Sequence, residues 1–411
     1  MKIIPSLFFG LTVFFSSVAF SHGEAGSVSE KRMMNFPDTN NAKTIISDLH
    51  THSVFSDGHV WPNVRVTEAT RDGIDLLAIT EHLEYQPHLD HIPHTNRNAA
   101  YLEAKKAAKG EDLIVVSGSE ITREMPPGHI NAIFLQDSND LLFLDKKKIK
   151  MARLALKESQ EVINPDQVAM AEMYALANQW PAVLAVNEAN KQKAFVFWNH
   201  PGWTAQSSDG VASLTEMHKT FIESNSLHGI EIANGDTFSE EAFQIALDNK
   251  LTLIGTSDVH DLIDWDYPSE LGSHRPVTLI FSEKRNKRSI KKALFERKTV
   301  VWFKDILIGE KENLMPLLES MLLARSAGYI SRTQVLKIEL SNNSSAPLKL
   351  QNLSEYSFRT STDLLEVPPN GKLEIQVKTL KKLKELKLDF KVVNALVEPK
   401  VNPMLTIKVK I

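Results

Sequence analysis

Eight short apolar runs between residues 44 and 281 constrain the fold most strongly, because helical stretches separate them at regular intervals. The runs are TIISDLH, DLLAITEH, LIVVSGSE, HINAIFL, FVFWNH, GIEIANG, LTLIGTSDVH and PVTLIF. Alternating strand-like and helical segments are typical of a parallel α/β sheet that closes into a barrel. We therefore predict an α/β fold for residues 44–305, a distorted barrel of about seven or eight strand–helix units.

Histidines and acids stand at or just beyond the C-terminal ends of these runs. They are His50, His82, Glu120, His200, Asp258 and His260. Active sites of α/β barrels gather at this end of the strands. His129 is the exception, because it precedes its run, HINAIFL. One antiparallel or irregular strand would bring it to the same end, so we predict a single site at the C-terminal mouth of the barrel.

Six histidines and three acids form the candidate metal-ligand set. They are His50, His52, Asp57, His82, Glu120, His129, His200, Asp258 and His260. Imidazole nitrogens and carboxylate oxygens are ligands that zinc, manganese and iron accept. His50 and His52 are two residues apart, so on a strand both side chains point to the same face. A single histidine is more often a plain core or surface residue, but the joint pattern favours a multinuclear metal site and a metal-dependent hydrolase.

Four motifs in this order resemble those of the polymerase and histidinol phosphatase superfamily, known as PHP. They are DLHTHSVFSDG, AITEH, the SGSE and GH pair with NHPGW, and TSDVH. The resemblance covers residues 44 to about 303 and implies a metal-dependent phosphoesterase with three divalent ions, Mn, Zn or Fe. It also implies that a hydroxide shared by two ions attacks phosphorus while the third ion neutralises a phosphate oxygen.

The same resemblance divides the ligands among the three ions. The groups are His50, His52, Glu120 and Asp258 for the first ion, Glu120 as a bridge with His129 and His200 for the second, and Asp57, His82 and His260 for the third. Three divalent ions bring +6 and the three carboxylates bring −3, so the site keeps a positive charge that favours an anionic phosphate ester.

Four residues are candidates for catalysis or substrate binding: Asp258, Glu81, Arg123 and Arg275. Many PHP proteins have aspartate where this chain has Glu81, which we interpret as an orienting residue, with a general-acid role as the alternative. Both arginines could hold a phosphate through their forked donors. An ion pair or a solvated surface position is an equal alternative for each.

Two further features have open interpretations. His88, His91 and His94 are spaced by three residues, as metal ligands can be, but prolines in the segment favour an irregular loop. Trp203 follows NHPG and either stacks on a base or closes the pocket by packing. Residues 137–194 contain no ligand candidate and are predicted to be helical, covering the barrel wall or forming a lid.

After residue 305 the pattern changes to a predicted connecting helix, residues 306–330, and then to alternating apolar and polar residues. Residues 331–411 also contain NNSS and PPNG turns, which predicts a small antiparallel β-sandwich of about five to seven strands. The last histidine of the chain is His274, so this domain should supply no histidine ligand. We expect it to cap the barrel or form a dimer surface rather than bind carbohydrate.

The first 21 residues are typical of a cleaved secretory signal, with Lys2, an apolar run and small residues before His22. An uncleaved anchor is the alternative, but the run falls short of the ~20 residues that a membrane span needs. Residues 22–43 are predicted to be a linker. The chain has no cysteine, which excludes disulfides, thiolate metal sites and cysteine nucleophiles. We expect a periplasmic or secreted protein without stable membrane insertion after cleavage.

The net charge of −4 and the lack of a long basic run argue against binding of long nucleic acid. The leading hypothesis is hydrolysis of a small phosphodiester, because exported PHP proteins with an added C-terminal β domain are similar to a phosphodiesterase-like branch of the superfamily. One alternative is a phosphomonoesterase or nucleotide phosphatase. Another is a non-catalytic metal-binding or adhesion protein, for which a missing ligand would be the sign. A homo-oligomer is an open alternative.

Overall fold

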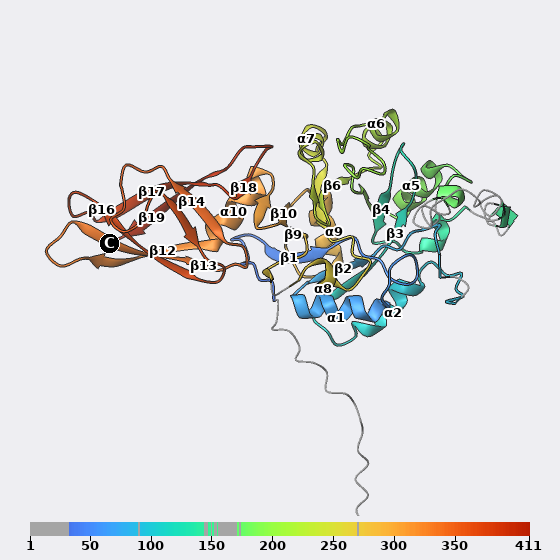
Figure 1. The fold of residues 1–411 in the computed structure, drawn as a ribbon, viewed down its shortest axis with the longest axis horizontal. Helices are drawn as coiled ribbons and strands as arrows, with labels where there is room; N and C mark the ends of the chain where they lie inside the picture. The colour runs from blue at the N-terminus through green and yellow to red at the C-terminus, as the bar shows by residue number, and fades with distance from the viewer. Residues whose placement is uncertain are drawn as a thin grey trace, which may run out of the picture. The chain divides into compact units, whose positions relative to one another are not determined.

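The computed structural model describes residues 33–88, 91–143, 147–148, 150–151, 154, 171, 174–268 and 271–411. The predicted leader, residues 1–21, lies outside the described residues, as does most of the predicted helical stretch between residues 144 and 173. The described chain forms a curled mixed sheet with helices, followed by two small antiparallel sheets (Figure 1). This arrangement confirms the predicted fold class.

The curled sheet contains twelve strands, and each of the eight predicted runs forms one of them. The strands are β1 (Lys43–Asp48), β2 (Leu76–Ile79), β3 (Ile114–Ile121), β4 (Ile130–Ile133), β5 (Phe195–Trp198), β6 (Gly229–Asn234), β7 (Thr237–Phe238), β8 (Thr252–Thr256), β9 (Val277–Ser282), β10 (Thr299–Phe303), β11 (Ile306–Ile308) and β18 (Ala395–Leu396). Their order is β18-β11-β10-β9-β1-β2-β3-β4-β5-β6-β7, and β8 also pairs with β6.

Helices and one short 3-10 turn connect the strands of this sheet. They are α1 (Pro62–Asp72), α2 (Ala99–Ala107), η1 (Ser138–Leu141), α5 (Ala182–Lys191), α6 (Glu216–Glu223), α7 (Glu240–Asn249), α8 (Ile263–Asp266) and α9 (Lys287–Phe295). Within the residues that the structure describes, no helix is both long enough and apolar enough to span a bilayer.

Strand directions explain how the barrel is distorted. The pairs β1–β2, β2–β3, β5–β6 and β6–β8 are parallel, as predicted. β4 is antiparallel to both β3 and β5, so the residue before it, His129, lies at the end where the parallel strands finish. β9 is also antiparallel to β1, its blue neighbour in Figure 1. The sheet is therefore mixed rather than wholly parallel.

Side chains rather than a main-chain ladder join β8 to β9 and β10. The Thr278 hydroxyl accepts a bond from the Gly255 amide at 2.9 Å and lies 2.8 Å from the Gly255 carbonyl. Thr299 Oγ1 donates to the Leu253 carbonyl at 2.9 Å. Apolar side chains of seven strands fill the interior beneath this junction, including Ile45, Leu76, Val116, Ile133, Phe195, Phe197, Ile254 and Ile280.

The C-terminal strands form the predicted sandwich. They are β12 (Leu322–Tyr329), β13 (Val335–Asn342), β14 (Leu348–Asn352), β15 (Leu364–Val367), β16 (Lys372–Lys378), β17 (Glu385–Val392) and β19 (Met404–Lys410). One sheet has the order β12-β13-β16 and the other β15-β14-β17-β19. Buried residues alternate with half-buried residues along β13 and with exposed residues along β19, as two packed sheets require.

The connection between barrel and sandwich is less helical than predicted. Helix α10 occupies only Lys311–Met321, and β12 begins directly after it at Leu322. Exposure along Leu322–Tyr329 alternates with a period of two, which is the pattern of a strand. β11 pairs with β18 of the C-terminal part, so the connecting segment contributes strands to both sides. The boundaries 44–305 and 331–411 remain predictions.

Candidate metal centre

Two histidines after β1 form the floor of the site. His50 Nε2 lies 3.0 Å from His52 Nε2, and Asp258 Oδ1 lies 3.1 Å and 3.2 Å from these two nitrogens. His50 Nδ1 lies 2.9 Å from Glu231 Oε1, and His52 Nδ1 lies 3.2 Å from Ser56 Oγ. When each Nδ1–H donates to its oxygen, both Nε2 lone pairs face Asp258. Three acceptors at this separation repel one another unless a cation lies among them.

The Glu120 carboxylate lies between this group and the next. Its Oε2 is 3.4 Å from His52 Nε2, while its Oε1 is 3.0 Å from His129 Nδ1 and 3.4 Å from His200 Nε2. The two histidines come from different elements, since His129 precedes β4 and His200 follows β5. One carboxylate thus faces the predicted first and second ligand groups, which is the position that a bridging ligand needs.

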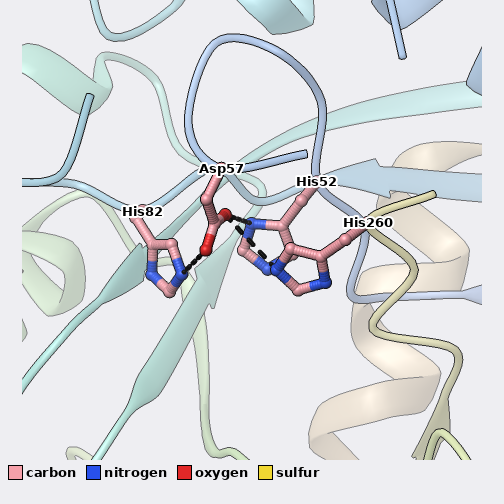
Figure 2. A group of neighbouring side chains, drawn as sticks. All are labelled: His52, Asp57, His82 and His260. Carbon is pink, nitrogen blue, oxygen red and sulfur yellow. Dashed lines mark ion pairs between the residues drawn. The ribbon is translucent and has the colours of Figure 1, made fainter. Parts of the chain in front are cut away.

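Asp57 gathers the third predicted group (Figure 2). Its Oδ2 lies 3.2 Å from His82 Nε2, and its Oδ1 lies 3.3 Å from His260 Nε2. His52 Nδ1 also approaches Asp57 Oδ1, at 3.6 Å. In Figure 2 the Asp57 carboxylate lies between the ring of His82 and those of His52 and His260. Strands and loops far apart in the sequence therefore meet at this carboxylate.

The donor set fits metal ions. Three groups have ligand atoms within 4.8 Å of one another: His50, His52 and Asp258; His82, Glu120 and His129; and His52, Asp57, His82 and His260. Two buried polar atoms of the cluster, Asp57 Oδ1 and His200 Nδ1, have no hydrogen-bond partner. Buried polar atoms without partners are costly, and coordination to a metal ion would satisfy the carboxylate oxygen.

Electrostatics in the cluster also favours positive charge. Burial alone would raise the pKa of Glu120, but the surrounding histidines hold it well below its usual range. Burial would lower the pKa of His50, yet the carboxylates of Asp258 and Glu120 raise it well above its usual range. The field of the carboxylates thus attracts a cation to the histidine nitrogens, and a divalent ion meets that demand more fully than a proton.

The backbone is strained at two of the ligands. His200 has φ 28° and Asp258 has φ 52°, in the left-handed region that residues with a Cβ rarely adopt. Asp258 N donates to the His50 carbonyl at 3.0 Å, which helps to hold this conformation. Strain of this kind persists where the surrounding contacts determine the position of a functional side chain.

Glu231 is a functional candidate that the sequence reasoning missed. Its carboxylate is buried inside β6 and lies 2.9 Å from His50 Nδ1, and it accepts bonds from the His200 amide at 2.7 Å and from Thr256 Oγ1 at 2.7 Å. It also accepts a bond from Asn234 Nδ2 at 2.9 Å. The sequence did offer a sign of this role, because Glu231 is the only charged residue in the strand-like run GIEIANG. Glu231 orients ligands rather than lining the cavity.

Asn199 was missed as well. Its Nδ2 donates to Glu120 Oε1 at 2.7 Å, so an amide fixes the orientation of the central carboxylate. The signal was weak, because asparagine next to His200 in NHPG fits a turn equally well.

Glu81 lies beneath the loop that carries Asp57. It accepts a bond from the Ser53 amide at 3.1 Å and from Ser56 Oγ at 2.5 Å, and Ser56 in turn contacts His52 Nδ1. Burial raises the pKa of Glu81 to about 6 against the effect of these hydrogen bonds. Its place in this network supports the interpretation as an orienting residue, and Glu81 is not among the residues that line the cavity.

The two candidate arginines do not reach the cavity. Arg123 forms an ion pair with Glu84, and its guanidinium lies 4.3 Å from the Trp180 ring centroid. Arg275 Nη1 lies 3.1 Å from Asp48 Oδ2, and its Nη2 lies 2.7 Å from Asp72 Oδ2. The ion-pair alternative therefore describes both residues. A buried guanidinium needs such a partner, because an unpaired charge would be strongly destabilising.

The QPHLDHIPH loop joins none of the metal-ligand groups found among the described residues. His94 lies 3.0 Å from Gln86 Nε2, and its ring packs on Phe55 at 4.6 Å between centroids. These contacts agree with the plain-loop interpretation. Trp203 instead lies at the cavity, with its ring 5.7 Å from His129 and 5.2 Å from His200 between centroids.

A cavity of about 450 Å³ opens over these groups, which is enough for a small organic ester. Its lining residues are Asp57, His82, Tyr85, Glu120, His129, His200, Trp203, Asn234, Gly235, Asp236, Thr237, Asp258 and His260. Seven of the nine predicted ligands therefore line the cavity, and the other two, His50 and His52, are buried next to it.

Comparisons with known proteins agree with this geometry. The chain is similar to the crystal structure of a two-domain protein from Bacteroides vulgatus that contains a predicted PHP-like metal-dependent phosphoesterase. The two are 33% identical with a TM-score of 0.77, and the match covers 93% of this chain and 99% of that one.

Two further matches each cover part of the chain. A family model described as an Ig-like domain matches residues 323–408. An uncharacterized protein of Methanocaldococcus jannaschii is 27% identical over 228 residues, 55% of this chain and 87% of that protein. Fold, metal-ligand groups and full-length similarity together show that the chain belongs to the two-domain PHP-like metal-dependent phosphoesterases, with an Ig-like domain after the barrel.

Proposed function

We propose that the protein hydrolyses a small phosphodiester at a trinuclear metal site. The observation that carries the proposal is the position of Glu120. Its Oε2 faces His52 at 3.4 Å and His82 at 2.8 Å, and its Oε1 faces His129 and His200. Divalent ions bound there would polarise the phosphate and make water nucleophilic near neutral pH. The ligand groups would be those that the resemblance implies, with Glu120 shared by two of them.

The residues of the chain hold and orient this centre. Buried carboxylates and neutral imidazoles would hold the ions, while Glu231 and the Ser56–Glu81 pair determine which imidazole nitrogens of His50 and His52 face the centre. Burial of His50 and His52 keeps bulk water from their side of the centre, so the ester approaches from the cavity. A diester bound through its phosphate at the centre would extend one alcohol group into the cavity. There it would meet the lining residues that are not proposed ligands, such as Trp203 and Thr237.

The first experiment compares two chromogenic esters. Protein reconstituted separately with Mn, Zn or Fe is assayed on bis(p-nitrophenyl) phosphate beside p-nitrophenyl phosphate. We expect faster turnover of the diester. Faster turnover of the monoester would instead favour a phosphatase, and turnover of neither ester with any metal would support the non-catalytic alternative.

A second experiment tests the bridging role. Glu120→Ala should lower kcat/KM by at least about 1,000-fold, because one lost carboxylate weakens the binding of two ions. It should also lower the metal content, which elemental analysis measures after dialysis. The matched control is Glu124→Ala, which removes an exposed carboxylate four positions away. Wild-type metal content and activity in Glu120→Ala would contradict the bridging assignment.

We also propose that the protein acts in the periplasm or after secretion. The signal-like residues 1–21 and the absence of cysteine support this location. Mass spectrometry of the mature protein should find its first residue near His22. A mature chain that retains residues 1–21 would contradict export with cleavage.

A further inference from the structure

The cavity lining contains a second group of residues that take no part in the proposed metal binding. They are Tyr85, Trp203, Asn234, Gly235, Asp236 and Thr237. This group provides two aromatic rings, amide and hydroxyl groups and one carboxylate. Among the lining residues that the structure describes, none is a lysine or an arginine. A substrate group that extends away from the metal ions therefore meets no protein cation in the cavity.

Cations near the site are already bound to groups of the protein. Arg123 and Arg275 are 4% and 1% exposed and form ion pairs with buried acids, so an anionic group in the cavity cannot reach them. Lys304 donates its Nζ to the main-chain oxygen of Asp236 at 2.7 Å and is not a lining residue. These contacts leave the Asp236 carboxylate as the charged group of the lining beyond the proposed metal ligands.

Asp236 has a well-determined position at the edge of the cavity. It lies in the two-residue turn between β6 and β7, in which Asn234 pairs with Thr237. Gly235 adopts φ 56°, which such a tight hairpin turn favours, and its amide donates to the Thr256 carbonyl at 3.1 Å. The turn is therefore fixed by two hydrogen bonds, one from Gly235 to Thr256 and one from Lys304 to the main-chain oxygen of Asp236. The Asp236 side chain is exposed at the opening of the cavity.

We propose that Asp236 makes this site selective for phosphodiesters whose second alcohol group is uncharged or cationic, and that it disfavours esters carrying a second anionic group. The inference rests on the proposed function, since it assigns a substrate class to the same site. Metal ions bound at the centre would favour one phosphate. A further anion on the alcohol group would lie beside Asp236, where it is repelled, with no lysine or arginine among the described lining residues to compensate.

The same lining would accept a cation or an apolar group. The Trp203 and Tyr85 rings offer apolar surface to an uncharged group and a favourable face to an ammonium group. Coulomb repulsion between two unit charges about 7 Å apart near a protein surface, roughly halved by the screening of about 0.1 M salt, predicts about a tenfold lower kcat/KM for an anionic alcohol group.

Three p-nitrophenyl phosphodiesters of similar size test the proposal. Their second alcohol groups are 3,3-dimethylbutyl, 2-(trimethylammonio)ethyl and 3-carboxypropyl, so charge varies while the bond that breaks stays the same. We expect kcat/KM for the carboxylate ester to be about tenfold below that of the neutral ester. Asp236→Asn should reduce this ratio to about two, and salt of about 1 M should reduce it in the wild type.

The matched control is Glu241→Gln, which removes one negative charge from α7 five positions away, outside the cavity lining. It should leave the wild-type ratio unchanged. An equal kcat/KM for the neutral and anionic esters, or an unchanged ratio in Asp236→Asn, would overturn the proposal while the phosphodiesterase function stands.

Binding separates failure of the inference from failure of the function. Calorimetry on the metal-loaded protein compares 3,3-dimethylbutyl phosphate with 3-carboxypropyl phosphate, in the wild type and in Asp236→Asn. We expect about tenfold weaker binding of the anionic compound, with the difference lost in the variant. If none of the three diesters is hydrolysed, the proposed function fails. Even then the binding experiment still tests the inference, because equal affinity for the two phosphates would overturn it.

Discussion

Single residues around the metal centre divide into ligands and the groups that orient them. Asp258 is subject to two opposing effects. Burial would raise the pKa of its carboxyl, but the neighbouring His50 and His52 lower that pKa strongly, and their effect prevails. Its amide and its side chain are both held, the side chain by Asn234 Nδ2 at 3.2 Å. Such a carboxylate remains ionised across the working pH range and is ready to bind a cation.

Glu231 provides the sharpest test of an orienting role. Glu231→Gln keeps the shape but replaces a charged acceptor by an amide, so His50 Nδ1 and the His200 amide lose their shared carboxylate. We expect metal affinity to fall about 10- to 100-fold, as measured by competition with a chelator of known affinity. Glu223→Gln, an exposed change at the end of α6, is the control. Wild-type metal affinity in Glu231→Gln would rule out the orienting role.

At the scale of elements, a glycine in β8 allows this strand to lie close to β10. A Cβ at Gly255 of β8 would overlap with Val301 of β10, so glycine lets the two strands approach. We expect Gly255→Ala to lower the free energy of unfolding by about 1–3 kcal/mol, measured by urea denaturation of the metal-free protein. The double change Gly255→Ala with Val301→Ala should be more stable than the sum of the two single effects. Strict additivity would contradict the proposed overlap.

Helix α6 carries a buried histidine whose protonation opposes folding. His218 stacks on Trp198 with ring centroids 3.8 Å apart, and its Nε2 lies 2.7 Å from the Pro127 carbonyl. Burial lowers its pKa from 6.5 to about 4. Below pH 6.5 the unfolded chain takes up a proton that the folded chain does not, so stability falls as pH decreases from 6.5 to about 4.

The variant His218→Gln isolates this effect. Between pH 7.5 and pH 5 the metal-free wild type should lose about 2 kcal/mol more of its free energy of unfolding than the variant does. Urea denaturation at both pH values measures the difference. Equal losses in the two proteins would show that His218 does not set this part of the pH dependence.

At the scale of the whole molecule, the barrel and the C-terminal sandwich are joined by the β11–β18 pair and by the side chain of Asn394 next to it. Asn394 Nδ2 donates to the Asp305 carbonyl at 2.9 Å and to the Pro347 carbonyl at 2.8 Å, and its Oδ1 accepts from the Lys349 amide. We expect Asn394→Ala to lower the free energy of unfolding by about 1–3 kcal/mol, because buried main-chain groups lose their partners.

Metal content should not change in Asn394→Ala, since every ligand candidate lies at or before His260. Urea denaturation and elemental analysis give the two readouts. Gln351→Ala, an exposed change on β14, serves as the control. A loss of bound metal in Asn394→Ala would show that the C-terminal domain shapes the metal centre.

Much of the barrel, and the gathering of the candidate ligand residues at one place, could be predicted from the sequence. The eight strands follow from runs of apolar residues. His50 and His52 lie just beyond β1, on either side of Thr51, which forms a bridge with Val259, and the Nε2 atoms of both histidines face Asp258. The segment Leu322–Tyr329 was misassigned, because LLARSAGY is apolar enough at its start to continue the preceding helix.

The sequence by itself determined the strand pattern and the types of the metal-binding side chains, because both depend on local periodicity and on which atoms can donate electrons. The place of His129 before its run already indicated one antiparallel or irregular strand, which is β4. Only the tertiary structure decided the direction of β9 and the closure of β8 through threonines. It also decided that Arg275 neutralises Asp48 and that Glu231 orients His50, 181 positions away. Such pairings depend on contacts between distant segments, which chain order does not specify.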